Sequence, residues 1–342
     1  MQSEGLFSKK ATGWFKGLAI IMVILSHFAE WWSWFQVEEG VSELIRYGVS
    51  RFGPYGVGIF FLFSGYGLSK SAGDKRIGFR FILKRFVNVY IPYLLIVIAI
   101  KLLSGGFASK EDVLKIFYGQ DFWYMTVLFS FYLAFMAIWF VFANRHIRAV
   151  LMAAFTWWYS NYLYIGGKMD FWFISNIAFA VGVLFALYEP ELKKMPKKLW
   201  SIPAVLFGLG SCYVVYSALY VEHVFAEPID EHRCRILAVT VFILFIASLA
   251  AAWKWYDVIM PFLGKHSIYL YLWHTYLFMW AVNHYTEMEI PVRFVIATAF
   301  ILGVAIGMGI VMELLLKPVN WLLSKKKKKV PAEPASNNGG VS

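Results

Sequence analysis

The chain has 342 residues, of which 60% are hydrophobic, 20% are aromatic and only 15% are charged, and its mean hydropathy is +0.61. A soluble domain of ordinary composition has roughly 25% charged residues, so this chain has too little polar surface to cover a soluble globule of its size. The composition excludes a cytosolic enzyme, a disordered protein and a secreted disulfide scaffold, and it predicts a polytopic membrane protein. The net charge of +11 is explained more simply by cytoplasmic lysine and arginine than by nucleic-acid binding.

Ten apolar stretches are close in length to the roughly 20 residues that a membrane-spanning helix requires. In chain order they cover residues 14–35, 54–71, 87–104, 122–143, 148–165, 171–188, 199–221, 235–253, 266–285 and 291–316. None of them alternates with a period of two residues, which favours helices over the strands of a membrane barrel. The predicted fold is therefore an all-α membrane bundle of about ten transmembrane helices.

The charge of the connecting segments predicts how the bundle is oriented. Most of the 32 lysines and arginines fall in the two tails and in every second loop, so the positive-inside rule places both termini in the cytoplasm. Residues 1–324 are predicted to form the integral membrane domain. Residues 325–342 combine a lysine run with Pro, Gly and Asn, which predicts a disordered cytoplasmic tail. The expected location is a cell membrane, with the bacterial plasma membrane as the prediction.

The first stretch contains three ionisable residues, and such residues inside a membrane are candidates for function. Lys16 and His27 are eleven positions apart, about 16 Å and three turns of helix, so they lie on one face. Glu30 follows on the same face. A histidine base oriented by a carboxylate, with a cation nearer the cytoplasm, fits this pattern. The alternatives are snorkelling of Lys16, a packing role for His27 and an outer-interface position for Glu30.

Three further segments carry candidate residues. The glycine-rich stretch from Gly56 to Gly67 is interpreted as a close-packing surface and not as a nucleotide loop, and within it Ser64 either bonds its own helix or lines a cavity. The loop from Lys70 to Arg85 holds six cations and one acid, which is typical of a topological signal or of a site for a phosphate-bearing ligand. His274 lies about 12 Å along the ninth stretch, either packed among aromatics or at a depth close to that of His27.

Five motifs in chain order resemble the acyltransferase 3 family of integral membrane acyltransferases. They are Lys16-Gly-Leu-Ala-Ile-Ile-Met-Val-Ile-Leu-Ser-His27, Gly56-Val-Gly-Ile-Phe-Phe-Leu-Phe-Ser-Gly65-Tyr, Lys84-Arg85-Phe-Val-Asn88-Val-Tyr90-Ile-Pro92-Tyr93, Phe122-Trp123-Tyr-Met-Thr-Val-Leu-Phe-Ser-Phe-Tyr132 and Ser267-Ile-Tyr-Leu-Tyr-Leu-Trp-His274. The chain departs from the family pattern at Lys16, where the family most often has Arg. It also departs at Asn88, where a second Arg often follows Arg85.

The resemblance implies transfer of a short acyl group, usually acetyl from acetyl-CoA, to a hydroxyl of a cell-envelope polysaccharide or a lipid-linked glycan. It implies acetyl-CoA as a co-substrate, no permanently bound cofactor and no metal. The expected partners are acetyl-CoA or another short acyl-CoA, an envelope glycan acceptor and membrane lipid, but not nucleic acid.

The same resemblance gives each candidate residue an expected role. The catalytic group is His27 as general base, with Lys16 and Glu30. The coenzyme A phosphates are assigned to Arg85, Lys84 and Arg80. Positioning of the acceptor is assigned to His274, Ser267, Tyr269, Trp123 and Ser64. The identity of the acceptor, its side of the membrane, the formation of an acyl-enzyme on His27 and the oligomeric state stay open at this point.

A transporter or flippase of a glycan or small polar solute is the alternative function, with His27 and His274 lining its path. An inverted repeat with helices broken at the midplane would favour transport, whereas a basic pocket leading to His27 would favour the enzyme. A purely structural subunit is a third possibility, but it would not explain why the first helix carries ionisable residues, which are unfavourable inside a membrane.

Overall fold

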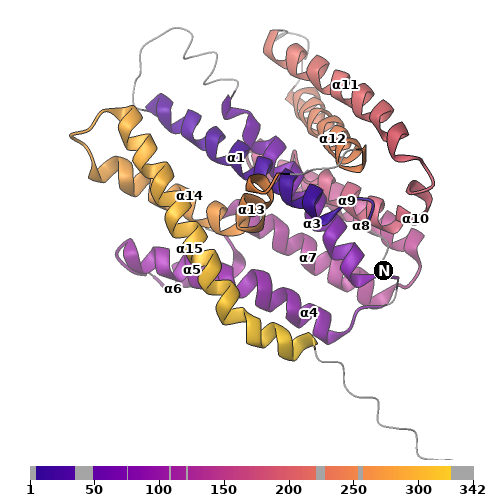
Figure 1. Ribbon diagram of the computed structural model, residues 1–342, viewed down its shortest axis with the longest axis horizontal. Helices are drawn as coiled ribbons and strands as arrows, with labels where there is room; N and C mark the ends of the chain where they lie inside the picture. Colours follow the sequence, from indigo (N-terminus) through magenta and orange to yellow (C-terminus); the bar gives the residue numbers. More distant parts are fainter. Residues whose placement is uncertain are drawn as a thin grey trace, which may run out of the picture.

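The computed structural model describes residues 5–34, 49–74, 76–107, 109–120, 122–220, 228–252 and 257–324. Over these residues the chain is helical and contains no strand (Figure 1), which confirms the predicted all-α class. The predicted tail, 325–342, lies outside the described residues. The division of the chain at residue 324 therefore stays a prediction.

The helices follow the predicted apolar stretches, so each of the ten stretches is represented by a helix. In chain order the elements are α1 (Lys9–Trp34), α3 (Phe52–Ala72), α4 (Phe79–Arg85), the π-helix η1 (Phe86–Tyr90), α5 (Ile91–Leu103), α6 (Lys110–Tyr118), α7 (Trp123–Val141), α8 (Arg145–Ile165), η2 (Asp170–Trp172), α9 (Ile177–Leu187), α10 (Glu189–Leu192), η3 (Lys197–Trp200), α11 (Ser201–Tyr220), α12 (Pro228–Ala252), α13 (Ile259–Lys265), α14 (Ser267–His284) and α15 (Ile290–Ser324).

Six of the described segments are long and apolar enough to cross a membrane, judged by length and composition. They are Lys9–Trp31, Phe79–Leu103, Trp123–Val141, Asp170–Leu187, Arg233–Ala252 and Val292–Leu323. These helices support a multi-pass membrane protein. The number of ten spans and the cytoplasmic location of both termini stay predictions.

Glycines hold the central helices together. A β-carbon on Gly65 of α3 would overlap the backbone of Phe179 in α9, and one on Gly182 of α9 would overlap the backbone of Leu62 in α3. Only glycine permits such close contact of two helix backbones. The predicted packing role of the glycines in the second stretch is therefore confirmed at Gly65, and its partner is α9.

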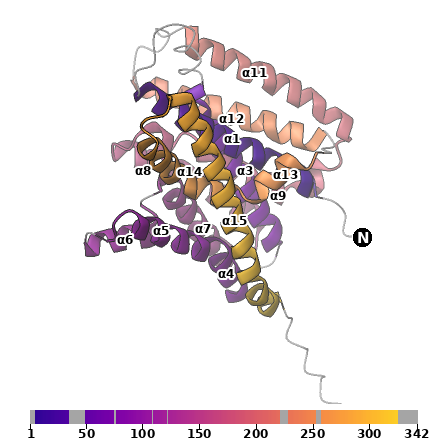
Figure 2. The ribbon, with the colours of Figure 1, turned by 60° about the vertical axis from the view of Figure 1, so that its left-hand side comes forward.

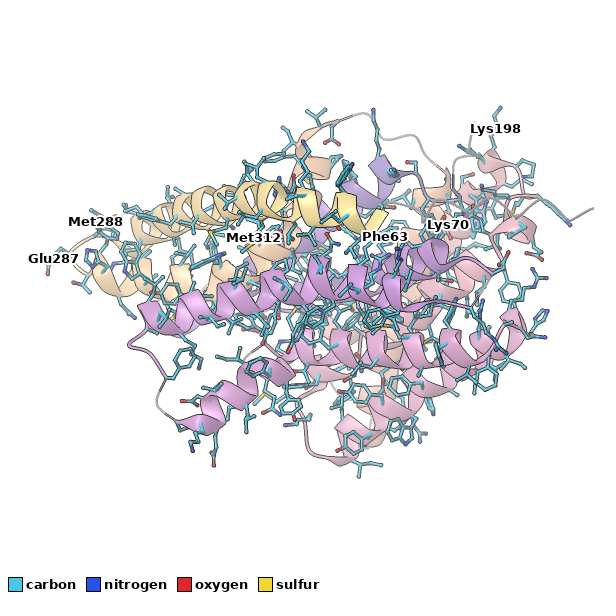
Figure 3. The ribbon with its side chains drawn as sticks, turned by 90° about the horizontal axis from the view of Figure 1, so that it is seen from below. Phe63, Lys70, Lys198, Glu287, Met288 and Met312 are labelled. Atoms are coloured by element: carbon cyan, nitrogen blue, oxygen red, sulfur yellow. The ribbon has the colours of Figure 1, made fainter. Side chains whose placement is uncertain are left out.

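The bundle has two distinguishable ends. Figure 3 shows Lys70 and Lys198 at one end, called here the basic end, and Glu287 and Met288 at the opposite end, called the far end. In Figures 1 and 2, α11 and α12 lie side by side at one edge of the bundle. The two loops that carry Lys70 and Lys198, both predicted to be cytoplasmic, therefore lie at the same end of the bundle.

The third predicted span is one continuous helix with a π-turn in it, because α4, η1 and α5 follow one another without a break. Single π-turns within α-helices are frequent at functional sites. Asn88 lies in this turn and exchanges two side-chain hydrogen bonds with Asn320 of α15, at 2.8 Å and 2.7 Å. These bonds tie the end of α15 to the helix that carries Arg85 (Figure 1).

Candidate active site

Two histidines from distant parts of the chain face each other between α1 and α14. The ring centroids of His27 and His274 are 5.0 Å apart and their planes differ by 29°. Trp31, one turn beyond His27, contacts both imidazoles, with its ring centroid 5.4 Å from that of His27 and 6.4 Å from that of His274. Trp31 in turn stacks on Phe278 at 4.0 Å. The four rings therefore hold the two imidazoles in fixed relative positions.

The carboxylate of Glu30 orients the ring of His27. Its Oε2 lies 3.3 Å from His27 Nδ1, and the two side chains are 49% and 32% exposed. A carboxylate only accepts hydrogen bonds, so this contact favours the tautomer with the proton on Nδ1. The unprotonated nitrogen of His27 is then Nε2, whose lone pair can accept a proton from a substrate hydroxyl.

His274 is held in a defined tautomer by its own helix. The ring is 1% exposed, and its Nδ1 donates to the carbonyl oxygen of Tyr271. Because a carbonyl only accepts, Nδ1 carries the proton and Nε2 presents a lone pair. Thr275 Oγ1 lies 3.3 Å from that Nε2 and is positioned to donate to it. His274 is therefore placed to accept a hydrogen bond.

Nearer the basic end, α1 and α4 each carry a cation, and the two lie within electrostatic range of each other. Lys16 and Arg85 are close enough to repel each other, and among the residues that the structure describes neither has an acidic partner. The Arg85 guanidinium lies 5.4 Å from the ring centroid of Phe81. Two partly buried cations without a counter-ion are suited to bind a phosphate or other anion.

A series of pairwise contacts between hydroxyl-bearing side chains runs from Arg85 to His274. The side chain of Ser64 is hydrogen-bonded with both Tyr124 and Tyr132, and Tyr132 also lies in the electrostatic field of Arg85. The rings of Tyr124 and Tyr271 are 5.0 Å apart. Tyr271 in turn lies 5.5 Å from His274. A line of polar side chains thus connects the cation pair with the histidine pair, and Ser64 is part of it.

The remaining candidates lie elsewhere. Lys84 and Arg80 are exposed on α4. Ser267 and Tyr269 are buried near the start of α14, about 10 Å and 8 Å along the helix before His274, and Tyr269 packs near His266. Trp123 packs against two other aromatic side chains, Phe171 at 5.2 Å and Trp172 at 6.1 Å. The structure therefore brings His27, Glu30 and His274 into contact, and it separately places Lys16 and Arg85 within electrostatic range of each other.

Several residues that complete this arrangement were not predicted from the sequence: Trp31, Tyr124, Tyr132, Tyr271 and Thr275. Helical spacing was the available signal, since Trp31 follows His27 by four positions and Tyr271 precedes His274 by three. In a chain that is 20% aromatic, such spacings occur too often to single out these residues. Among the described residues, no group of His, Cys, Asp and Glu side chains is placed to hold a metal ion.

Apolar helices that carry a histidine pair with a carboxylate and, separately, two cations define a multi-pass membrane protein with polar groups among its helices. The chain belongs to the acyltransferase 3 family, since the family's model, described as an acyltransferase domain, matches residues 11–312. The match runs from α1 into α15 and confirms the resemblance that the five motifs indicated. No curated protein and no solved structure matches the chain. By family the protein is a membrane acyltransferase.

Proposed function

We propose that the protein transfers an acetyl group from acetyl-CoA to a hydroxyl of a cell-envelope polysaccharide or lipid-linked glycan at a bacterial plasma membrane, with His27 as general base. The observation that carries the proposal is the pairing of His27 with Glu30, which leaves Nε2 of His27 free. Family membership supplies the reaction type. The cation pair supplies a place for the phosphates of the donor.

The reaction follows from the groups around His27. Nε2 takes the proton of the acceptor hydroxyl as its oxygen attacks the thioester carbonyl. An ester C–O bond forms, the C–S bond breaks, and the coenzyme A thiolate leaves and takes the proton from the imidazolium. The Glu30 carboxylate stabilises that imidazolium, as does the ring face of Trp31. No permanently bound cofactor takes part in this sequence.

The donor is expected to lie along α1. Its phosphates contact Lys16 and Arg85, with Arg80 and Lys84 nearer the basic end. Lys16 and His27 are about 16 Å apart along the helix, a separation comparable to an extended pantetheine arm. The thioester then lies beside His27 while the phosphates remain at the cations. Lys16 in place of Arg supplies a single point charge and no bidentate contact.

The acceptor is expected to be positioned beside the histidine pair. His274 is buried and its Nε2 faces Thr275 Oγ1, so it is proposed to act through His27, on whose ring it stacks, and Ser64 adds a hydroxyl on the donor side. Trp123, with its aromatic neighbours, offers a surface suited to stacking of a sugar ring. Ser267 and Tyr269 are proposed to act only by supporting the start of α14. The transporter alternative has less support, because His274 is 1% exposed and so does not line an open path.

The proposal is tested with the full chain in lipid vesicles, acetyl-CoA labelled in its acetyl group and an envelope glycan fraction. Label is expected in alkali-labile esters on the glycan. Arg85→Ala should raise the KM for acetyl-CoA by about tenfold or more with little change in kcat, because it removes a charged contact worth about 1.5–3 kcal/mol. Lys198→Ala, a cation at the same end (Figure 3), is the matched control. Glycan movement across the membrane without labelling would instead support transport.

A further inference from the structure

A buried carboxylate at the basic end joins three separate parts of the chain. Glu189 is 2% exposed. It accepts a hydrogen bond from the Tyr66 hydroxyl at 2.8 Å and pairs with Lys70 at 2.9 Å and Lys193 at 2.7 Å. The Tyr66 oxygen also accepts from the backbone N–H of Phe7 at 3.4 Å. Glu189 therefore ties together the N-terminal segment, the end of α3 and α10.

The charged state of Glu189 is favoured in this position. Burial by itself raises the pKa of the carboxyl group, but the hydrogen bonds from Lys193, Lys70 and Tyr66 outweigh burial and hold the pKa below its ordinary value of 4.5. At neutral pH the carboxylate is ionised. It therefore compensates the charge of Lys70, which is the first cation of the Lys70–Arg85 loop.

A buried guanidinium holds the same loop from a second side. Arg148 of α8 is fully buried. It donates to the carbonyl oxygens of Phe142 at 2.8 Å, Gly73 at 3.4 Å and Asp74 at 2.9 Å, and it lies 4.9 Å from the ring centroid of Trp139. The planar fork of arginine suits such contacts with several oxygens at once. Arg148 therefore fixes the turn that follows α3.

These contacts fix the first half of the loop at three points. Glu189 holds Lys70, Arg148 holds the next turn, and the backbone N–H of Ile77 donates to the carbonyl of Trp139 at 3.4 Å. Helix α4 begins two residues later at Phe79 and carries the predicted donor-binding cations. The position of these cations therefore depends on contacts made several residues earlier in the chain.

We propose that Glu189 and Arg148 are positioning residues of the donor site, which fix the loop so that Arg85 meets Lys16. This inference rests on the proposed function, because it takes coenzyme A as the donor. Neither residue contacts the donor itself. The carboxylate of Glu189 also keeps Lys70 out of the donor site and leaves the phosphates to the cations of α4.

The histidine site should be insensitive to this loop. His27 lies eleven residues beyond Lys16, and its ring is held by Glu30, Trp31 and His274. A shift of about 1 Å in a positioning group can change a rate or affinity by up to about 100-fold. Loosening the loop should therefore weaken donor binding by about tenfold and leave the chemical step nearly unchanged.

The experiment uses two variants. Arg148→Lys keeps the positive charge but loses the planar guanidinium group that donates to several oxygens. Glu189→Gln keeps a hydrogen-bond acceptor but loses the negative charge. Glu313→Gln is the control, since it breaks a more exposed ion pair with Lys265 at 2.7 Å. Each full-length variant is reconstituted in vesicles, and all values are normalised to inserted protein. Two quantities are measured: the kinetic constants for acetyl-CoA and the rate of trypsin cleavage after Arg76, which is exposed.

For both test variants we expect faster cleavage after Arg76, an increase of about tenfold in the KM for acetyl-CoA, and a kcat within twofold of wild type. The control should match wild type in all three. An unchanged KM, with or without faster cleavage, overturns the inference, as does a fall in kcat alone. A wild-type protein that turns over no acetyl-CoA rejects the proposed function, and the positioning role is then rejected with it. Normal wild-type turnover with an unchanged KM rejects only the positioning role.

Discussion

Replacement of Glu30 by Gln tests whether the carboxylate acts on His27 by stabilising the imidazolium. The pair is 3.3 Å apart and both side chains are partly exposed. At that distance two unit charges attract by about 1.3 kcal/mol in bulk water and about 5 kcal/mol at an effective dielectric constant of 20. Exposed ion pairs measure only about 0.2–1 kcal/mol. We therefore expect a loss of about 1 kcal/mol, which lowers kcat about fivefold.

The assay measures kcat for acetyl transfer at saturating acetyl-CoA, with Glu30→Asp as a control that keeps the charge on a shorter side chain. In the His27→Gln background, Glu30→Gln should have no further effect, because the two residues act as a unit. An unchanged kcat in the single variant would refute the proposed orientation of His27. A loss as large as that of His27→Gln would show that the carboxylate itself takes the proton.

Two further predictions concern the stability of the bundle. Gly182→Leu should lower stability by about 1–3 kcal/mol and reduce the midpoint of thermal unfolding in detergent. Gly307→Leu should not, because a β-carbon added to Gly307 meets no atom within 4 Å. Equal midpoints for the two variants would contradict the tight contact of α3 with α9. Because the pKa of folded Glu189 lies below 4.5, its stabilising effect is present above that pH and is lost as the pH falls through the folded pKa. The wild-type midpoint should therefore fall more steeply below pH 4.5 than that of Glu189→Gln, and parallel curves would contradict this reading.

The parts of the site that could be predicted from the sequence are those set by one helix. The spacing of Lys16, His27 and Glu30 places them on one face because helix geometry is fixed, and the structure forms the contact between His27 and Glu30. A small-residue pattern also predicted close packing of α3. The identity of its partner, α9, depends on Gly182, whose surroundings in the sequence carry no special signal.

The parts that could not be predicted depend on contacts between distant segments. Motif order and depth brought His274 into consideration, but only the packing of α14 on α1 stacks it on His27. Arg148 and Glu189 lie beside the ends of apolar stretches, where charged residues usually reflect only the orientation of the protein in the membrane. Their partners are backbone carbonyls and side chains from other helices. Apart from Lys193, which follows Glu189 by four positions, no spacing rule within one segment leads to these partners.

The central claim is that His27 is the base of an O-acetyl transfer, and one measurement tests it most directly. Glycan-bound acetyl esters are quantified in cells that carry the wild-type protein, His27→Gln or His284→Gln, each present in the membrane at equal amount. A general base contributes roughly 10²–10⁴-fold, so we expect the His27 variant to lose at least about 100-fold of the acetylation rate and the His284 variant to match wild type. Acetylation at the wild-type rate in the His27 variant would contradict the account.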